Sequence, residues 1–262
     1  MEKQYSIIGS YNGLLCLYNE YERCVMLRNP SIMFESKKSP PVSLGWTIQH
    51  HGFGYDQVNN KYKVLLAMRK KNDHALTKIY IFGEDSWKTI PNFPTSRAPL
   101  RLSAKFVRST FNWIVEKRDV ISNQTVILSF DLGNETYKEI LMPQEDGVKV
   151  YKHTLYVLNN CLGVCQVSNK THWVAWLMKE YGVFDSCTKF VIISLDNFNK
   201  KSFFVIPLFI SENGVILLMN SDSYQFVLYN LNSGKLDYLL EDTYNFMFNL
   251  HICCESLVSV TW

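Results

Sequence analysis

The chain has 262 residues, of which 47% are hydrophobic and 19% charged, with a formal net charge of +3 and a sequence pI near 8.4. This composition supplies a large core and excludes a disordered chain, and the charge is too low for a nucleic-acid-binding domain, whose pI usually exceeds about 9. No apolar run approaches the roughly 20 residues of a membrane helix, and residues 1–4 lead into a run too short for a signal peptide. We therefore expect cytoplasmic or nuclear localisation, with the seven cysteines as reduced, mostly buried thiols.

Five short apolar runs recur along the chain at nearly constant spacing. Their central residues are 49, 49, 50 and 52 positions apart, and a period near 50 residues indicates a repeat architecture. Four of the runs follow an Asn-containing turn, and Asn and Gly accept the positive φ angles of short hairpin loops. The run around Trp113 instead follows Thr110, Phe111 and Asn112. The run centres are Cys16, Leu65, Ile114, Val164 and Ile216, and the turns are Asn12-Gly13, Asn59-Asn60, Asn159-Asn160 and Asn213-Gly214.

A second landmark has the same period. Each unit carries an outer hairpin, and the loops of these hairpins are 54, 49, 51 and 48 residues apart. β-Branched and aromatic runs flank each loop, as is typical of strands. One further run precedes each inner turn, so each unit is predicted to contain four strands. The outer loops are centred on Ser31, Asp85, Asn134, Asp185 and Ser233, and the first strands are residues 5–9, 53–56, 105–108, 154–158 and 204–210.

Four-stranded units at this period predict an all-β fold, a β-propeller of about five blades, or six if the chain ends contain another. The alternatives are a β-sandwich and a partial solenoid. A propeller must close its ring, because an open last blade exposes unpaired backbone groups at its edge. The apolar tail, residues 246–258, is the predicted closing strand of the first blade. We expect residues 1–262 to form a single domain.

Potential catalytic and metal-binding residues are few. No Gly-x-Ser-x-Gly elbow, Gly-rich phosphate loop or His-Glu-x-x-His motif occurs, and no Cys pair has the matching second pair of a zinc site. Asp56 is the acidic residue of the runs expected to line the central channel. We therefore assign no catalytic, cofactor-binding or metal-binding residue, and we expect no cofactor and no enzyme activity. The ligand pairs considered are His50 with His51, Cys161 with Cys165, and Cys253 with Cys254.

Several motifs have packing roles that follow from their residues. The two glycines of GFGYD, residues 52–56, predict a bulge or a close backbone approach. The run from Trp173 to Met178 is apolar on both faces, which predicts a strand buried between neighbouring blades. Trp87 and Tyr137 follow equivalent outer loops, and we expect both to pack against the preceding blade.

Seven strings, in order along almost the whole chain, resemble the plant F-box associated domain of type 1. This domain occurs in F-box and kelch-like substrate receptors. The strings are GSYNGLLCLYN at 9–19, RNPS at 28–31, GFGYD at 52–56 with YKVL at 62–65, SFDLGNETYKEI at 129–140, HWVAWLMKEYGVFDSCTKF at 172–190, ENGVILL at 212–218 and ESLVS at 255–259.

The resemblance implies that the propeller recognises a target protein. In the family, an F-box at the N-terminal side couples the propeller to a Skp-type adaptor and a cullin-based ubiquitin ligase. An F-box is a helical module of roughly 40 to 50 residues, and none precedes the first predicted blade here. We therefore expect a truncated form, an incomplete gene product or a natural form without that module, with adaptor and cullin as partners only if an F-box is supplied. We expect no nucleic-acid or membrane partner.

Two other functions remain open. The first is a propeller enzyme or small-ligand binder that uses the channel and depends on His51 or Asp56. The second is a non-functional remnant without an F-box. If the domain recognises a protein, the contacts are expected in its most irregular loops, because specificity usually resides in variable loops on a rigid scaffold. These loops are residues 35–49, 69–78, 92–100, 144–149 and 197–202.

Overall fold

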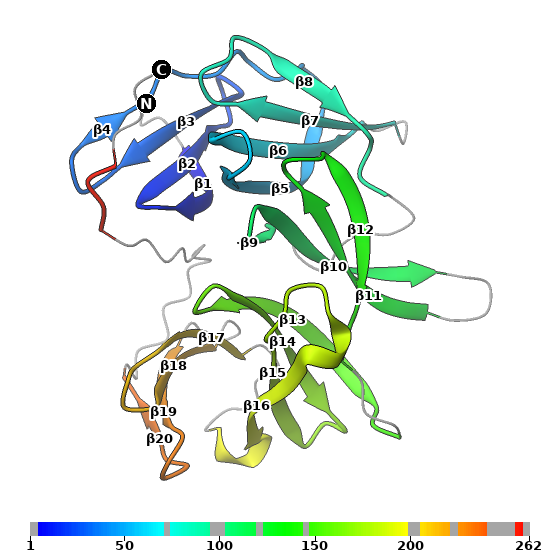
Figure 1. The fold of residues 1–262 in the computed structure, drawn as a ribbon, viewed down its shortest axis with the longest axis vertical. Helices are drawn as coiled ribbons and strands as arrows, with labels where there is room; N and C mark the ends of the chain where they lie inside the picture. Colours follow the sequence, from blue (N-terminus) through cyan, green and yellow to red (C-terminus); the bar gives the residue numbers. More distant parts are fainter. Residues whose placement is uncertain are drawn as a thin grey trace. The chain divides into compact units, whose positions relative to one another are not determined.

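The computed structural model describes residues 5–70, 74–94, 103–118, 123–143, 147–198, 205–220, 225–239 and 255–258 (Figure 1). These residues form twenty β-strands and two short 3-10 turns, Phe184–Ser186 and Leu195–Asn197. The strands make five four-stranded antiparallel sheets, and within each sheet the strand order follows the chain. None of the helical segments described is long and apolar enough to cross a membrane. The predicted all-β fold with five four-stranded blades is confirmed.

The strand boundaries follow the predicted repeat. The first blade contains β1 (Tyr5–Tyr11), β2 (Leu14–Asn19), β3 (Cys24–Asn29) and β4 (Phe34–Glu35). The second contains β5 (Thr47–Asp56), β6 (Lys61–Arg69), β7 (Ala75–Ile81) and β8 (Trp87–Ile90). The third contains β9 (Lys105–Val107), β10 (Thr110–Arg118), β11 (Asn123–Asp131) and β12 (Thr136–Leu141). The fourth contains β13 (Val150–Leu158), β14 (Cys161–Ser168), β15 (His172–Met178) and β16 (Cys187–Ser194). The fifth contains β17 (Val205–Ile210), β18 (Val215–Asn220), β19 (Gln225–Asn230) and β20 (Leu236–Tyr238).

The chain divides into two compact units. Unit 1 comprises residues 1–124, 128–138 and 249–262, and unit 2 comprises residues 125–127 and 139–248. The core of unit 1 joins the first two blades through side chains such as Leu14, Leu27 and Leu66. The core of unit 2 joins the fourth and fifth blades around Trp173 and Ile216. The single domain over residues 1–262 stays a prediction.

The tail was expected to supply a closing strand, but most of it, residues 246–254, lies outside the described residues. Its described part, residues 255–258, contains no strand. The buried side-chain amide of Asn29 donates hydrogen bonds to the carbonyl oxygens of Ser256 (2.8 Å) and Val258 (2.9 Å). All four strands of the first blade come from residues 5–35. The described tail is therefore attached to this blade through a side chain.

Most inner turns have the predicted conformation, with positive φ at Asn12 and Gly13 and at Asn159 and Asn160. In the third blade, the predicted first strand, residues 105–108, is one residue too long, because β9 ends at Val107. β10 begins at Thr110, and the turn between them is Arg108-Ser109, with φ angles of 47° and 58°. Neither residue favours this region, but the Ser109 hydroxyl donates to the carbonyl of Tyr55 (3.2 Å), and this contact with the second blade helps hold the turn.

β5 begins six residues before the predicted start, at Thr47, because β6 is long enough to pair with it through Thr47 and Arg69. The GFGYD glycines make the predicted close approach. A Cβ on Gly54 would lie 2.2 Å from the Phe106 ring of the third blade, and one on Gly52 would lie 2.8 Å from Phe111. Glycine at both positions therefore lets two blades pack closely.

Two aromatic residues after the outer loops pack as predicted. The Trp87 indole donates a 2.8 Å hydrogen bond to the carbonyl of Pro40, in the segment that follows the first blade. The Tyr137 ring packs at 5.9 Å from Phe93, in the segment that follows the second blade. Each residue thus contacts the connection that leaves the preceding blade.

Candidate functional site

The connections of each blade alternate between its two ends. In the first blade, residues 12–13 and 30–33 join strands at one end, here called the turn end. Residues 20–23 and the link 36–46 to the second blade lie at the opposite end, the loop end, because successive strands are antiparallel. By the same alternation, the described residues of the five irregular loops expected to bind a target lie at the loop end of their own blades. Parts of four of them, residues 71–73, 95–100, 144–146 and 199–202, lie outside the described residues.

The link 36–46 is fixed along β3. The backbone amide of Ser36 donates to Leu27, that of Ser39 to Val25 and that of Val42 to Arg23. The Ser36 and Ser39 hydroxyls accept hydrogen bonds from the amides of Leu27 (2.9 Å) and Val25 (3.0 Å). β4 has only two residues, so these contacts satisfy β3 groups that β4 does not reach. The loop predicted from residue 35 is therefore ordered.

Arg23 holds the second half of this link. Its guanidinium donates hydrogen bonds to the carbonyl oxygens of Val42 (3.2 Å), Ser43 (2.9 Å) and Trp46 (2.9 Å). The ammonium of Lys70, directly after β6, lies 4.9 Å from the centre of the Trp46 ring, within cation–π distance. The 20–23 turn and the 36–46 link thus form one hydrogen-bonded surface at the loop end of the first two blades.

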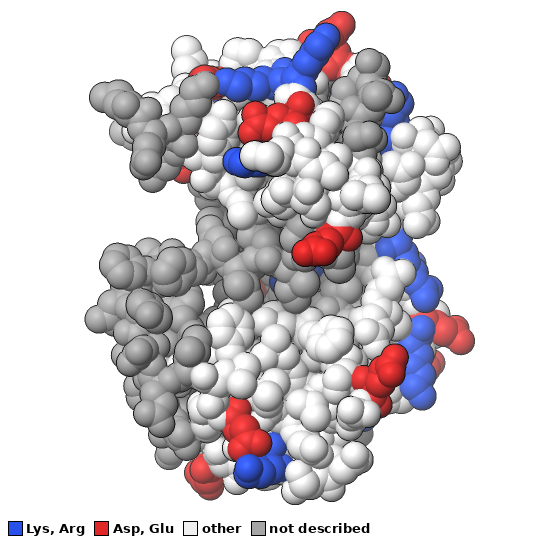
Figure 2. All heavy atoms as spheres, turned by 90° about the vertical axis from the view of Figure 1, so that its left-hand side faces the viewer, with Lys and Arg blue, Asp and Glu red and all other residues white. Residues whose placement is uncertain are grey.

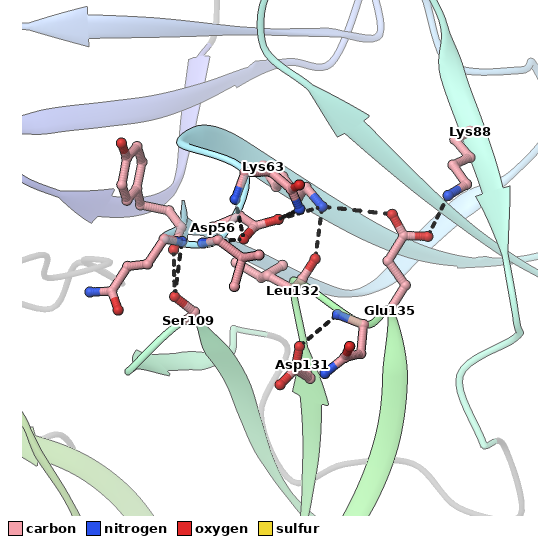
Figure 3. A network of polar contacts seen from close by, with 12 residues as sticks. Asp56, Lys63, Lys88, Ser109, Asp131, Leu132 and Glu135 are labelled. Atoms are coloured by element: carbon pink, nitrogen blue, oxygen red, sulfur yellow. Dashed lines mark hydrogen bonds and ion pairs between the residues drawn. The ribbon is translucent and has the colours of Figure 1, made fainter.

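The turn end of the second and third blades is built on a buried charge network (Figure 3). Lys63 of β6 lies 2.8 Å from the Asp56 carboxylate of β5 and 3.7 Å from Glu135, and its ammonium donates to the carbonyl of Leu132 (2.7 Å). The side chains of Lys63 and Asp56 are 4% and 0% exposed. Glu135 also pairs with the exposed Lys88 at 2.6 Å. The network joins two neighbouring blades of unit 1.

Asp56 also shapes its own turn. Its carboxylate accepts hydrogen bonds from the backbone amides of Val58 (3.0 Å) and Asn59 (3.2 Å) and from the side-chain amide of Asn59 (2.7 Å). Burial alone would raise the pKa of Asp56, but the hydrogen bonds from Asn59 and Lys63 and the charge of Lys63 outweigh it and lower the pKa. Asp56 is therefore an ionised structural group.

The two histidines considered for channel chemistry lie on the second blade, and His50 packs in its interior. His50 and His51, expected just before the first strand of the second blade, lie inside β5. The His50 ring packs 4.7 Å from Phe93, and burial, followed by the charges of His51 and Arg69, lowers the pKa of His50 to about 4. The carbonyl of His51 accepts a hydrogen bond from the amide of Ala104 (2.8 Å). These contacts tie β5 to the segment that enters the third blade.

The cysteine pair of the fourth blade lies on one strand, β14. Cys165 is buried in the core of unit 2, and Cys161 is half-buried at the start of the strand. Gly163 lies between them, where a Cβ would come within 2.1 Å of the Tyr156 ring. No cluster of three or more His, Cys, Asp or Glu side chains suited to a metal ion occurs among the described residues. Cys253 and Cys254 lie outside them.

In unit 2, Trp173 confirms the strand predicted to be buried between blades. It is buried on β15, and its indole donates a 2.9 Å hydrogen bond to the carbonyl of Val205 in the fifth blade. At the loop end of the fourth blade, the Gln166 side chain donates to the carbonyl of Pro143 (2.8 Å). These bonds fix the strand and the link that enters this blade.

Several residues that build the surface at the loop end of the first two blades could not be predicted from the sequence. Arg23, Ser36 and Ser39 lie in polar segments without a recognised motif, and their partners are up to 23 positions away. Their roles depend on which backbone groups β4 leaves unpaired, which the sequence pattern does not specify. The ion pair of Lys63 could have been predicted, because Lys63 interrupts an otherwise apolar strand and buried lysines are usually paired.

Five four-stranded antiparallel blades in chain order define the chain as a β-propeller, a scaffold whose function resides in its loops. The model of the F-box associated beta propeller domain matches residues 1–238. The chain belongs to this family.

Two curated relatives come from Arabidopsis thaliana. The chain is 26% identical to F-box/kelch-repeat protein At3g23880 over 97% of its own length and 69% of that protein. It is 25% identical to F-box protein CPR1 over 89% of its length and 63% of that protein. The chain thus spans about two-thirds of these relatives. Among solved structures, an oligogalacturonate lyase in complex with manganese matches with a TM-score of 0.51 and 7% identity, over 86% of this chain and 61% of the lyase, which supports the fold alone.

Proposed function

We propose that this chain is a protein-recognition domain, the target-binding part of an F-box subunit of an SCF-type ubiquitin ligase, without catalytic chemistry of its own. It binds a target protein through its loop ends and meets a Skp-type adaptor and a cullin only when an F-box is joined to it. We place it in the cytoplasm or the nucleus.

One observation carries the proposal: the family match spans residues 1–238, and the two relatives described above are F-box proteins. The described geometry supports recognition over catalysis. Asp56, one of the two residues on which the channel-enzyme alternative depends, is fully buried in an ion pair. Its carboxylate is therefore not available to a substrate, which weakens that alternative.

The surface charge also favours a protein partner. On the face drawn in Figure 2, basic and acidic side chains are interspersed among uncharged ones, and its described residues form no continuous basic band. A nucleic-acid-binding domain usually presents a coherent basic face. This supports the expectation that nucleic acid is not the partner.

The test is quantitative affinity capture from plant extract with two baits, the chain alone and the chain with an F-box fused before residue 1. We expect the same target proteins with both baits and a Skp-type adaptor with the fusion alone. An adaptor captured by the chain alone would contradict the requirement for an F-box. The absence of any specific protein from both captures would contradict the proposed recognition.

A further inference from the structure

We propose that the loop end of the first two blades binds an acidic segment of the target protein that carries an aromatic or large aliphatic side chain. This inference rests on the proposed function and names the surface and the partner chemistry. The binding surface, here called the basic–aromatic patch, consists of Tyr21, Arg23, Lys37, Leu44, Trp46 and Lys70.

Charge is concentrated in this region. The segments 20–23, 36–46 and 69–70 contain five basic residues and two acidic ones, a formal net charge of +3. This equals the formal net charge of the whole chain, so the charges of all remaining residues sum to zero. A partner with complementary acidic residues gains association rate and specificity at such a surface. The basic residues are Arg23, Lys37, Lys38, Arg69 and Lys70, and the acidic ones are Glu20 and Glu22.

Large side chains protrude within the same region. Tyr21 is 77% exposed and Leu44 is 82% exposed. Trp46 is half-buried, with Lys70 near its ring. Tyr, Trp and Arg are the residue types that most often carry binding energy at protein interfaces, where they pack in desolvated, well-packed pockets that are poor in charged groups. The patch therefore favours an acidic segment with an aromatic or aliphatic anchor.

The patch is organised before any partner binds. The buried Asn19 side chain accepts hydrogen bonds from the amides of Tyr21 (3.0 Å) and Glu22 (2.8 Å), which fixes the turn that presents Tyr21. Arg23 fixes the backbone on both sides of Leu44 through Ser43 and Trp46. The backbone on which Tyr21 and Leu44 stand is thus already ordered, and pre-ordering of an interface lowers the entropic cost of binding.

Five basic residues are a small number for a nucleic-acid surface, and Arg23 already bonds three carbonyl groups. Lys38 is paired with Glu22. A single-stranded oligonucleotide would need a longer basic path with several stacking platforms. An acidic protein segment, which needs a few charges and one apolar contact, fits this surface better.

The test uses a random 12-residue peptide library displayed on phage and selected on the immobilised full chain. Selected peptides are then synthesised, and their binding is measured by fluorescence anisotropy at low and high salt. We expect enriched peptides to be acidic with an aromatic or Leu residue, and to bind more weakly at high salt. Tyr21→Ala, and separately the double change Lys37→Glu with Lys70→Glu, should each weaken binding about tenfold or more, as expected for hot-spot residues.

Two matched controls lie outside the patch. Val58 is 79% exposed in the β5–β6 turn, and Lys138 is an exposed lysine of β12. Val58→Ala and Lys138→Glu should change the dissociation constant less than about twofold, since surface positions away from an interface contribute little. All changed side chains are at the surface, and circular dichroism confirms that each variant is folded.

Three results would overturn the inference: enriched peptides without an acidic excess, peptides that bind the patch variants as tightly as the wild type, or no enrichment. In each case the proposed function stands if affinity capture still yields specific targets, and it fails too if capture yields none. Displacement of the peptides by a single-stranded oligonucleotide at equal concentration would assign the surface to nucleic acid and would also overturn it.

Discussion

Replacing Lys63 by methionine tests whether the charge network holds the second and third blades together. Methionine keeps most of the length of the side chain but removes the ammonium. The change leaves the fully buried Asp56 carboxylate without its partner at 2.8 Å and removes the hydrogen bond to the carbonyl of Leu132. Breaking one partner of a buried ion pair costs about 3 to 5 kcal/mol, a large part of the roughly 5 to 15 kcal/mol that stabilises a typical domain.

The pH dependence provides a second signature. The folded-state pKa of Asp56 lies below its unfolded value, which is near 3.9 for a free Asp. The ion pair therefore contributes its full stabilisation above the unfolded pKa, and this stabilisation is lost as the pH falls through the folded pKa. In Lys63→Met, burial raises the pKa of Asp56, and protonation of the carboxylate then removes the cost of burying an unpaired charge. The stability difference between the two proteins is therefore largest near neutral pH and shrinks in acid.

The assay is urea unfolding followed by tryptophan fluorescence between pH 4 and pH 8. Lys88→Met is the matched control, because Lys88 pairs with the same Glu135 but is 58% exposed, and exposed pairs contribute about 1 kcal/mol or less. Asp56→Asn combined with Lys63→Met should cost less than the sum of the single changes. A loss below about 1 kcal/mol for Lys63→Met, or strict additivity, would refute a stabilising pair.

Three further changes test the packing. Gly54→Ala places a Cβ 2.2 Å from the Phe106 ring and should lower the free energy of unfolding in urea by about 1 to 3 kcal/mol. Gly133→Ala, whose nearest contact would be at 3.3 Å, is the control and should cost much less. Equal effects of the two changes would contradict the close approach at Gly54. Trp173→Phe leaves the Val205 carbonyl without its donor and should destabilise by about 1 to 3 kcal/mol in thermal unfolding, and a neutral result would argue against that hydrogen bond. Asn29→Asp keeps the acceptor for the amide of Ser31 but cannot donate hydrogen bonds to the carbonyl oxygens of Ser256 and Val258. Amide hydrogen exchange at residues 256–258 should therefore become faster. Unchanged exchange would show that these two hydrogen bonds do not hold the tail.

Much of the fold could be predicted because short local sequence patterns determine it. The 50-residue period, the Asn turns and the alternation of apolar runs with polar loops each specify a backbone feature over a few residues. The close approach at Gly54 and the burial of Trp173 were also predictable, because each follows from residue size at one position. Such features need no knowledge of distant partners.

The errors arose where distant contacts override local preference. The Arg108-Ser109 turn has a conformation that neither residue favours, and a hydrogen bond from Ser109 to the second blade helps hold it. The polar residues before Phe53 did not predict a strand, so the first half of β5 was missed. This half pairs with β6, and the length of β6 determines how far the pairing extends. At the patch, Arg23 bonds carbonyl groups 19 to 23 positions away, and no local pattern marks it.

Direct binding between the purified chain and a protein that it captures from plant extract is the most direct test of the account. The measurement is biolayer interferometry with the target immobilised, with the chain alone and with its F-box fusion as analytes. We predict saturable binding with the same dissociation constant for both, because the propeller alone carries recognition. Binding that appears only with the fusion, or no saturable binding of any captured protein, would contradict it.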